Sequence, residues 1–386
     1  MVWLVAIGLA LPLAIYTLEM LAGFGRRSAR EATARCAVAI LVPAHDEAAG
    51  IEAMLASLLA VVPHGCRIVV VADNCRDDTA ARVRALQVEA IERHEPELRG
   101  KGYALDFGRA YLAGDPPDVV IVIDADCRMH PGSIARLASA AFASGQPVQA
   151  LNLLYADLTA SPLVQLSNFA FLVKNAIRAR GLERLGGTTL LSGTGMAFPW
   201  TVFAAAPLAT GDIVEDLALG IELARRGARI SLLPSAVVQS ASSSVGDLRD
   251  QRTRWERGFV STARHSALPT LGEGLRRRSR ALVFLGLHLL VPPMAMLLLL
   301  AGMGLAGVGL AAALLGAQAL PVAVLTAALL AALAVTGIAW LRMGRETLRG
   351  TALLVAPLYV LWKIPMYLSF LTTAPLKWRR AGRSGG

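Results

Sequence analysis

Long apolar runs at both ends of the chain contrast with a mixed middle region. Residues 281–341 contain no Asp, Glu, Lys or Arg. A bilayer crossing needs roughly 20 apolar residues, so this run predicts two transmembrane helices joined by a short turn. Residues 1–25 lack a basic start and a small-residue cleavage site, which favours a transmembrane anchor over a signal peptide. Prolines and Lys363 interrupt 351–374, which predicts a further membrane span or a re-entrant or interfacial segment before a basic tail at 375–386.

The middle region, residues 35–275, alternates short apolar runs with stretches of helical periodicity. The runs read "AVAILVP", "CRIVVVADN" and "VVIVI", and helices are expected over 48–61, 77–90 and 103–113. Runs that are apolar on both faces are typical of a parallel sheet covered by helices. The pattern therefore predicts an α/β domain with a parallel sheet.

Polar residues follow each of the three predicted strands. They are His45, Asp46 and Glu47, then Asp73 and Asn74, then Asp124 and Asp126. Ligands of open α/β sheets bind beyond the carboxyl ends of the strands. One acid by itself, such as Asp77, could be a helix N-cap. Three strands that bring acids to one edge indicate a binding site.

Asp124 and Asp126 lie two residues apart at the end of a buried strand. Both can reach one divalent cation, and Mg²⁺ and Mn²⁺ prefer a few carboxylates together with phosphate oxygens. The alternative for an isolated pair is two solvated loop acids. Lys101, in "RGKG", has flexible neighbours and could reach a phosphate. Neither GxGxxG nor GxxxxGK[ST] follows a strand, so a dinucleotide cofactor or a P-loop is not supported.

Two later segments add candidate chemistry. Glu215 and Asp216 open a predicted helix, where acids are favoured by the helix dipole but could also supply a general base. In "QRTRWERGF", Gln251, Arg254 and Trp255 fall on one side of a helix. Arginine suits a diphosphate and tryptophan suits a sugar ring. The alternative is an amphipathic helix at a membrane interface.

Composition and charge support a membrane protein. The 386 residues are 55% hydrophobic and 17% charged, with a mean hydropathy of +0.53, whereas ordinary domains are about a quarter charged. Basic runs at 26–30 and 276–280 place the middle domain in the cytoplasm. The net charge of +10 lies largely at these flanks, which favours anionic lipid over nucleic acid. Four cysteines without a CxxC pair suit reduced cytosolic thiols and give no metal site.

The ordered motifs resemble those of a known family. They are VPAHDE, VVVADNCRDDT, GKGYAL, VIDAD, SGTGMAF, VEDLALG and QRTRW, over roughly 38–260. Together they resemble the membrane-bound family 2 glycosyltransferases of the cellulose synthase and poly-N-acetylglucosamine synthase-like group, the QxxRW type. The resemblance implies a GT-A-like nucleotide-diphospho-sugar transferase fold. Two departures are Asp46, where the family has Asn, and SGTG in place of a cysteine-containing acceptor motif. The second puts a cellulose-like acceptor in doubt.

The resemblance implies a role for each matching residue. The donor nucleotide would be bound by Pro43, Glu47, Asp73, Lys101 and Asp124. Asp124 and Asp126 would hold Mg²⁺ or Mn²⁺. Asp216 would be the catalytic base, with Glu215 in support. The diphosphate and acceptor would be bound by Gln251, Arg254, Trp255, Gly193, Thr194 and Gly195.

The expected function is inverting, metal-dependent transfer from a UDP-sugar to a hydroxyl of a growing polysaccharide, on the cytoplasmic side of the inner membrane. Helices at about 161–181 and 247–265 are expected to be interfacial. The alternative is transfer of one sugar to a lipid or polyprenyl-linked acceptor. The small number of predicted membrane spans favours this alternative, because a secretion channel would need more helices, an export partner or a homo-oligomer. A transporter or scaffold is disfavoured, because 281–341 lacks intramembrane charges.

Overall fold

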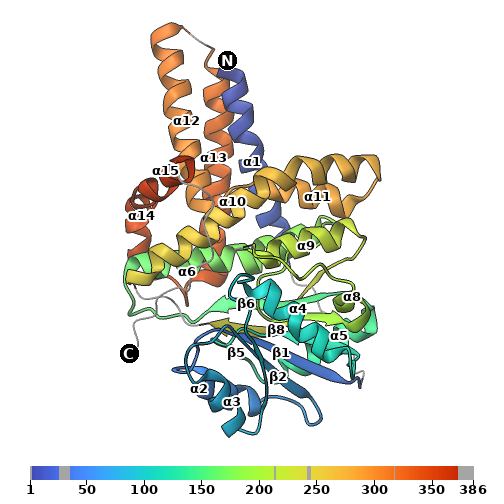
Figure 1. Cartoon of the computed structure of the whole chain (residues 1–386). Coiled ribbons are helices and arrows are strands. Elements are labelled where there is room, and N and C mark those ends of the chain that lie inside the picture. Colours follow the sequence, from blue (N-terminus) through green and yellow to red (C-terminus); the bar gives the residue numbers. More distant parts are fainter. Residues whose placement is uncertain (1, 26–34, 213, 241–244, 317, 373–386) are drawn as a thin grey trace. The chain divides into compact units, whose positions relative to one another are not determined.

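The computed structural model describes residues 2–25, 35–212, 214–240, 245–316 and 318–372. The chain divides into two units (Figure 1). The sheet unit is built from Arg27–Tyr155 and Thr188–Ala241, and the helical unit from Met1–Arg26, Ala156–Gly187 and Ser242–Pro375. Each unit therefore combines segments that are far apart in sequence.

Within the described residues, the sheet unit contains one eight-stranded sheet of order β3-β2-β1-β4-β7-β6-β8-β5. The strands are β1 (Val38–Ala44), β2 (Arg67–Asp73), β3 (Glu89–Arg93), β4 (Val119–Val122), β5 (Cys127–Met129), β6 (Val148–Leu154), β7 (Met196–Pro199) and β8 (Ser231–Ser240). β1 to β4 are mutually parallel, and β6 pairs parallel with β8. β7 runs antiparallel to β4 and β6, and β5 runs antiparallel to β8. The predicted α/β class is confirmed, with a mixed, mostly parallel sheet.

Both faces of the sheet are covered because its strands are apolar on both sides. In β1, Ile40 and Val42 enter one hydrophobic cluster, whereas Ala39 and Leu41 enter the other. The first cluster includes residues of α2 (Ile51–Leu59), α3 (Thr79–Ala85) and α5 (Ser133–Ser144). The second includes residues of α4 (Lys101–Leu112), α8 (Trp200–Ala204) and α9 (Glu215–Arg225).

One predicted helix boundary is wrong. The helix expected over 77–90 ends at Ala85, and Glu89–Arg93 forms the edge strand β3. Gln87 has a φ of +58°, a left-handed conformation that ends the helix and turns the chain back. The charged residues of β3 fit a sheet edge, where one side faces solvent.

Four helical segments of the helical unit could cross a membrane by length and composition: Val2–Gly23, Met294–Leu315, Leu320–Gly344 and Gly350–Phe370. The first three correspond to α1 (Val2–Gly23), α12 (Met294–Leu315) and α13 (Leu320–Ala339), which continues into a π-helical turn η2 (Trp340–Gly344). The fourth is broken into η3 (Gly350–Val355), α14 (Ala356–Trp362) and α15 (Ile364–Thr372). These are the terminal apolar helices that the sequence predicts.

The remaining helices of this unit lie crosswise to α12 and α13 (Figure 1). They are α6 (Pro162–Leu172), the π-helix η1 (Val173–Arg178), α7 (Ala179–Arg184), α10 (Val245–Arg276) and α11 (Arg280–Leu289). α10 and α11 pack together as a helical hairpin. Such crosswise helices are the geometry expected of the interfacial helices at 161–181 and 247–265, whose membrane contact stays a prediction.

Candidate active site

The carboxyl ends of β1, β2 and β4 share one edge of the sheet. The register pairs Ala44 with Ala72 and Leu41 with Val122, so the parallel strands end close together. Asp73 ends β2, and Asp124 follows β4 by two residues. The strand ends therefore place the predicted polar residues where ligands of such sheets bind.

Lys101, the first residue of α4, joins residues from three parts of the sheet unit. Its Nζ forms an ion pair with the carboxylate of Asp124 and donates a hydrogen bond to the Gly193 carbonyl at 2.6 Å. The Oε1 of Glu215 lies 4.0 Å from the same nitrogen. The site thus brings together a strand end, a glycine loop and the start of α9.

Gly193 lies against three charged side chains. A Cβ at this position would lie 3.5 Å from Asp216 Oδ2, 3.6 Å from Lys101 Nζ and 3.7 Å from Asp124 Oδ2. Its φ of +85° also favours glycine. The loop around Gly193 therefore brings the Asp216 carboxylate close to Lys101 and Asp124.

The rest of the SGTG loop is fixed by packing and hydrogen bonds. Thr194 Oγ1 accepts a hydrogen bond from the Asp124 amide at 3.2 Å. A Cβ on Gly195 would come within 2.7 Å of the Ala150 Cβ, so only glycine fits there. These contacts hold the loop beside the end of β4. The expected acceptor role of Gly193, Thr194 and Gly195 stays a prediction.

Acidic groups outnumber the one lysine in this cluster. Burial raises the pKa of Asp124, and its neighbour Asp126 raises it further, against the lowering effect of Lys101. Burial also raises the pKa of Glu215 to about 8, although Lys101 opposes the shift. Burial lowers the pKa of Lys101, but Asp124 and Glu215 more than offset this, so the pKa lies above its usual value. Excess negative charge of this kind suits a bound cation.

The residues after β4 offer a donor set for a hard divalent cation. Ligand atoms of Asp124, Asp126 and Cys127 lie within 4.8 Å of one another. The Cys127 thiol donates to Asp126 Oδ1 at 3.3 Å, and its burial raises the pKa well above the usual range. A protonated thiol is a poor ligand, which leaves two carboxylates. Carboxylate oxygens are the ligands that Mg²⁺ and Mn²⁺ prefer.

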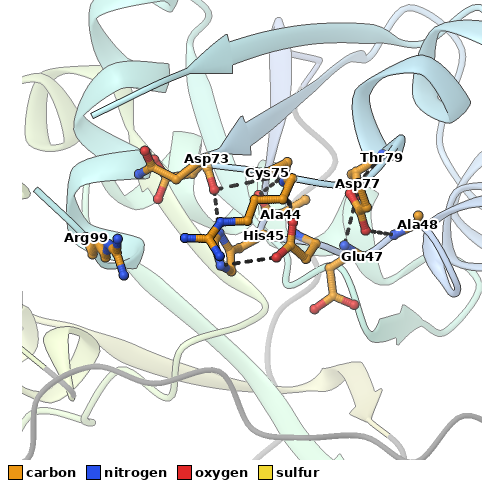
Figure 2. Close-up of polar contacts among 12 residues, drawn as sticks. Ala44, His45, Glu47, Ala48, Asp73, Cys75, Asp77, Thr79 and Arg99 are labelled. Carbon is orange, nitrogen blue, oxygen red and sulfur yellow. Dashed lines mark hydrogen bonds and ion pairs between the residues drawn. The ribbon is translucent and has the colours of Figure 1, made fainter. Parts of the chain in front are cut away.

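The loops after β1 and β2 are tied together by backbone contacts (Figure 2). His45 Nδ1 lies 2.6 Å from the Asp73 carbonyl oxygen. The Glu47 amide donates to Thr79 Oγ1 at 2.9 Å, and the Ala48 amide donates to Asp77 Oδ2 at 3.0 Å. Figure 2 shows the Glu47 side chain pointing away from its amide's contact. Asp77 therefore joins two loops at the start of α3.

Asp73 has a buried partner that no sequence motif indicates. Arg93 Nη1 donates to Asp73 Oδ1 at 2.7 Å, and both side chains are buried. Arg93 ends β3 and is the register partner of Asp73 in β2. Recognition of β3 as a strand would have revealed the pair. The Asp73 carboxylate is thus fixed by an ion pair, whereas its expected contact with the donor nucleotide stays a prediction.

Asp46 and Cys75 lie in the same loops without forming an evident second site. Ligand atoms of Asp46, Cys75 and Asp77 lie within 4.8 Å of one another. Asp46 Oδ1 accepts a hydrogen bond from the Arg76 amide at 2.6 Å. Burial raises the pKa of the Cys75 thiol to about 11, so it stays protonated. Loop-to-loop contacts account for this cluster.

Gln251, Arg254 and Trp255 belong to α10 of the helical unit. The Trp255 ring packs against Phe171 with 5.7 Å between ring centroids. All three side chains are half-buried. Their expected contacts with a diphosphate and an acceptor stay predictions.

Comparisons with known proteins agree with this fold. A family model described as "Glycosyltransferase like family 2" matches residues 34–258. No curated protein sequence matches the chain significantly. A solved mannosyltransferase, PcManGT from Pyrobaculum calidifontis in complex with GDP-Man and Mn²⁺, is 21% identical with a TM-score of 0.58, over 94% of this chain and 100% of that one.

A second solved structure has a weaker overall likeness. Glucosyl-3-phosphoglycerate synthase from Mycobacterium tuberculosis, in complex with Mn²⁺, UDP and phosphoglyceric acid, is 23% identical with a TM-score of 0.40, over 60% of this chain and 84% of that one. The family match covers more than half of the chain. The chain therefore belongs to glycosyltransferase-like family 2 and is a glycosyltransferase.

Proposed function

We propose that this enzyme is an inverting, metal-dependent glycosyltransferase that uses a UDP-sugar at the cytoplasmic face of the inner membrane. The acceptor in this proposal is a hydroxyl of a growing polysaccharide. The observation that carries the proposal is the approach of Lys101, Asp124 and Asp216 around Gly193. This arrangement supplies a cation, a metal-ligating carboxylate and a base within one small volume.

Asp216 is the carboxylate best suited to take a proton from the acceptor hydroxyl. The hydroxyl oxygen attacks the anomeric carbon from the side opposite the nucleoside diphosphate, and the carbon–oxygen bond to the diphosphate breaks. A single displacement of this kind inverts the configuration. Because burial raises the pKa of Glu215 to about 8, Glu215 holds a proton at neutral pH and is the poorer base.

The leaving diphosphate gains negative charge as its bond to the sugar breaks. A divalent cation held by Asp124 and Asp126 would neutralise that charge when bound. Lys101 keeps its proton, because the pKa lies above its usual value, and contributes a fixed positive charge beside Asp124. The complex of the mannosyltransferase from Pyrobaculum calidifontis with GDP-Man and Mn²⁺ supports a sugar nucleotide and a divalent cation as ligands.

A lipid or polyprenyl-linked acceptor is the second candidate. Only four described segments are long and apolar enough to cross a membrane, and one of them is broken. A secretion channel within a single chain would need more helices. The QRTRW motif favours a polysaccharide synthase, and the small number of spans favours transfer of one sugar to a lipid.

Incubation of membranes with labelled UDP- and GDP-sugars tests both candidates. Reactions would contain Mg²⁺ or Mn²⁺ or a chelator, and products would be divided into lipid-extractable and polymeric fractions. Metal-dependent incorporation of label into polymer supports a polysaccharide acceptor. Label confined to a lipid with one added sugar supports a lipid or polyprenyl-linked acceptor. Asp126→Asn should lose metal-dependent transfer, whereas Asp115→Asn, at a position that is 92% exposed, should keep it. Transfer that is unaffected by the chelator and by Asp126→Asn would overturn the metal site.

A further inference from the structure

Arg252 is a buried arginine of α10 that the proposed reaction does not use. It is 6% exposed, and its Nε has no hydrogen-bond partner among the described residues. Its Nη2 reaches the Ser167 carbonyl oxygen only at 3.5 Å. Burial lowers the pKa of this guanidinium. A buried charge with so few partners is costly unless a ligand compensates for it.

The carboxylate that acts on Arg252 already serves other groups. Glu256 lies one helical turn later, and its charge favours the charged form of Arg252. However, Glu256 forms an ion pair with the buried Lys363 and accepts a hydrogen bond from the Tyr367 hydroxyl at 2.8 Å. Two buried cations thus share one carboxylate, which leaves a net positive charge.

Aromatic contacts are too weak to compensate for this charge. The guanidinium of Arg252 lies 4.9 Å from the ring centroid of Trp255 and 5.4 Å from that of Phe171. A cation–π contact stabilises a cation only modestly. The free-energy cost of burying one ion is larger than this stabilisation, even after the protein relaxes. The rings orient the guanidinium but do not replace an anion.

Two hydroxyls near Arg252 are also unsatisfied. The Ser167 Oγ and the Tyr359 hydroxyl are buried and have no hydrogen-bond partner within the described parts of the chain. The backbone oxygen of Ser167 already contacts Arg252, and Tyr359 lies within electrostatic range of the guanidinium. Two hydroxyls and a guanidinium are all hydrogen-bond donors. A phosphate, whose oxygens accept several hydrogen bonds, complements such a set.

The surrounding elements indicate where this phosphate comes from. Tyr359 belongs to the candidate span Gly350–Phe370, so one of the three donors lies on a segment apolar enough to cross a membrane. We propose that Arg252, Ser167 and Tyr359 bind the phosphate of a lipid headgroup. The site does not depend on glycosyl transfer. If the acceptor is a lipid, the site would hold it beside Trp255 on the same helix.

Lipid binding by the purified full chain tests this site directly. Delipidated protein in detergent would be titrated with phosphatidic acid, with diacylglycerol of the same chains, and with inorganic phosphate. Binding would be followed by native mass spectrometry and by the shift in unfolding temperature. We expect phosphatidic acid to bind and diacylglycerol not to bind. Arg252→Met should weaken the binding of phosphatidic acid about ten- to a hundredfold, because charge-assisted hydrogen bonds are lost.

Arg264→Met is the matched control, because Arg264 lies exposed on the same helix. It should bind phosphatidic acid like the wild type. If Arg252→Met does not fold, Tyr359→Phe provides the second test and should weaken binding severalfold without lowering the unfolding temperature of the lipid-free protein. Equal binding by all variants, or equal binding of diacylglycerol, would overturn the site. Saturation by inorganic phosphate with no gain from the lipid chains would overturn the lipid source.

Discussion

Asp216 and Glu215 are adjacent carboxylates in different surroundings, and their substitution should separate two roles. Asp216→Asn removes the proposed base and keeps the shape of the side chain. We expect donor binding to stay near the wild-type level and the turnover of transfer to fall by about 100-fold or more, as is typical when a general base is lost. Donor affinity and turnover would be measured separately on the same preparation.

Glu222→Gln is the matched control for Asp216→Asn. Glu222 lies on the same helix, where it forms an ion pair with Arg226 at 2.8 Å, away from the Lys101 cluster. It should transfer sugar like the wild type. Wild-type turnover in Asp216→Asn, or an equal loss in Glu222→Gln, would show that the base lies elsewhere.

The raised pKa of Glu215 makes the stability of the ligand-free protein depend on pH. Burial raises this pKa from 4.5 to about 8 in the folded chain. The folded state therefore binds more protons than the unfolded state between these values. The stabilisation is fully present below pH 4.5 and is lost as pH rises towards about 8, by up to about 1.4 kcal/mol for each pH unit.

Glu215→Gln cannot ionise and should abolish this dependence. In the presence of a chelator, its unfolding temperature should exceed that of the wild type by a margin that grows as pH rises from about 5 to about 8. Glu222→Gln, with its exposed ion pair, should show no such growth. A margin that is constant or shrinks with pH would contradict the buried environment of Glu215.

The acidic residues of the candidate site were predictable from the sequence, whereas the residues that contact them were not. Asp124 and Asp126 were recognisable because two acids directly follow a buried strand, a local pattern. Arg93, the partner of Asp73, depends on the pairing of β2 with β3, which no local pattern reveals. The approach of Asp216 to Gly193 likewise depends on the path of two loops in space. Local chemistry was predictable, and its long-range contacts were not.

Two glycines allow α1 to pack very closely against the η1–α7 segment. A Cβ on Gly181 would lie 1.8 Å from the Glu19 carbonyl oxygen, and a Cβ on Gly23 would lie 2.1 Å from that of Ile177. Nearby, Arg178 Nε donates to Glu19 Oε2 at 2.8 Å, and His288 Nδ1 lies 2.8 Å from Glu19 Oε1. This buried cluster depends on the close approach of the helices.

Gly181→Ala should therefore destabilise the helical unit. The added methyl group clashes with backbone, which cannot move aside easily, so we expect a loss of about 1–3 kcal/mol or more. Gly8→Ala on α1 is the control, because nothing lies within 4 Å of its Cβ position. Unfolding temperatures in detergent would be compared. Equal stability of the two variants would contradict this packing.

Helices and strands with regular patterns were predictable, whereas elements defined by their partners were not. The apolar runs gave β1, β2 and β4, because strands buried on both faces contain few polar residues. β3 has a charged, half-buried pattern, and β7 is only Met196–Pro199. Short or edge strands become recognisable only once their neighbours are known.

The grouping of segments into two units was also beyond sequence patterns. The segment Ala156–Gly187 lies within the predicted catalytic region, yet it belongs to the helical unit together with α1. The sequence predicts an interfacial helix at about 161–181 but does not indicate which helix packs against it. The close approach of Gly181 and Glu19 places this segment in the same unit as α1. Local sequence patterns do not reveal this contact, because the two residues lie some 160 positions apart along the chain.

Membrane orientation is a property that the basic flanks predict and labelling can test. Arg276 ends α10 and Ala319 lies between α12 and α13, and both are exposed. Because arginines are retained on the cytoplasmic side, Ala319→Cys should react with a membrane-impermeant maleimide in intact cells. Arg276→Cys should react only after lysis. The chain without an added cysteine measures the background labelling of the four native thiols, which are half-buried or buried. The reverse pattern would place the basic flank outside the cell and contradict the proposed orientation. A cytoplasmic sugar nucleotide could not reach a catalytic domain joined to that flank.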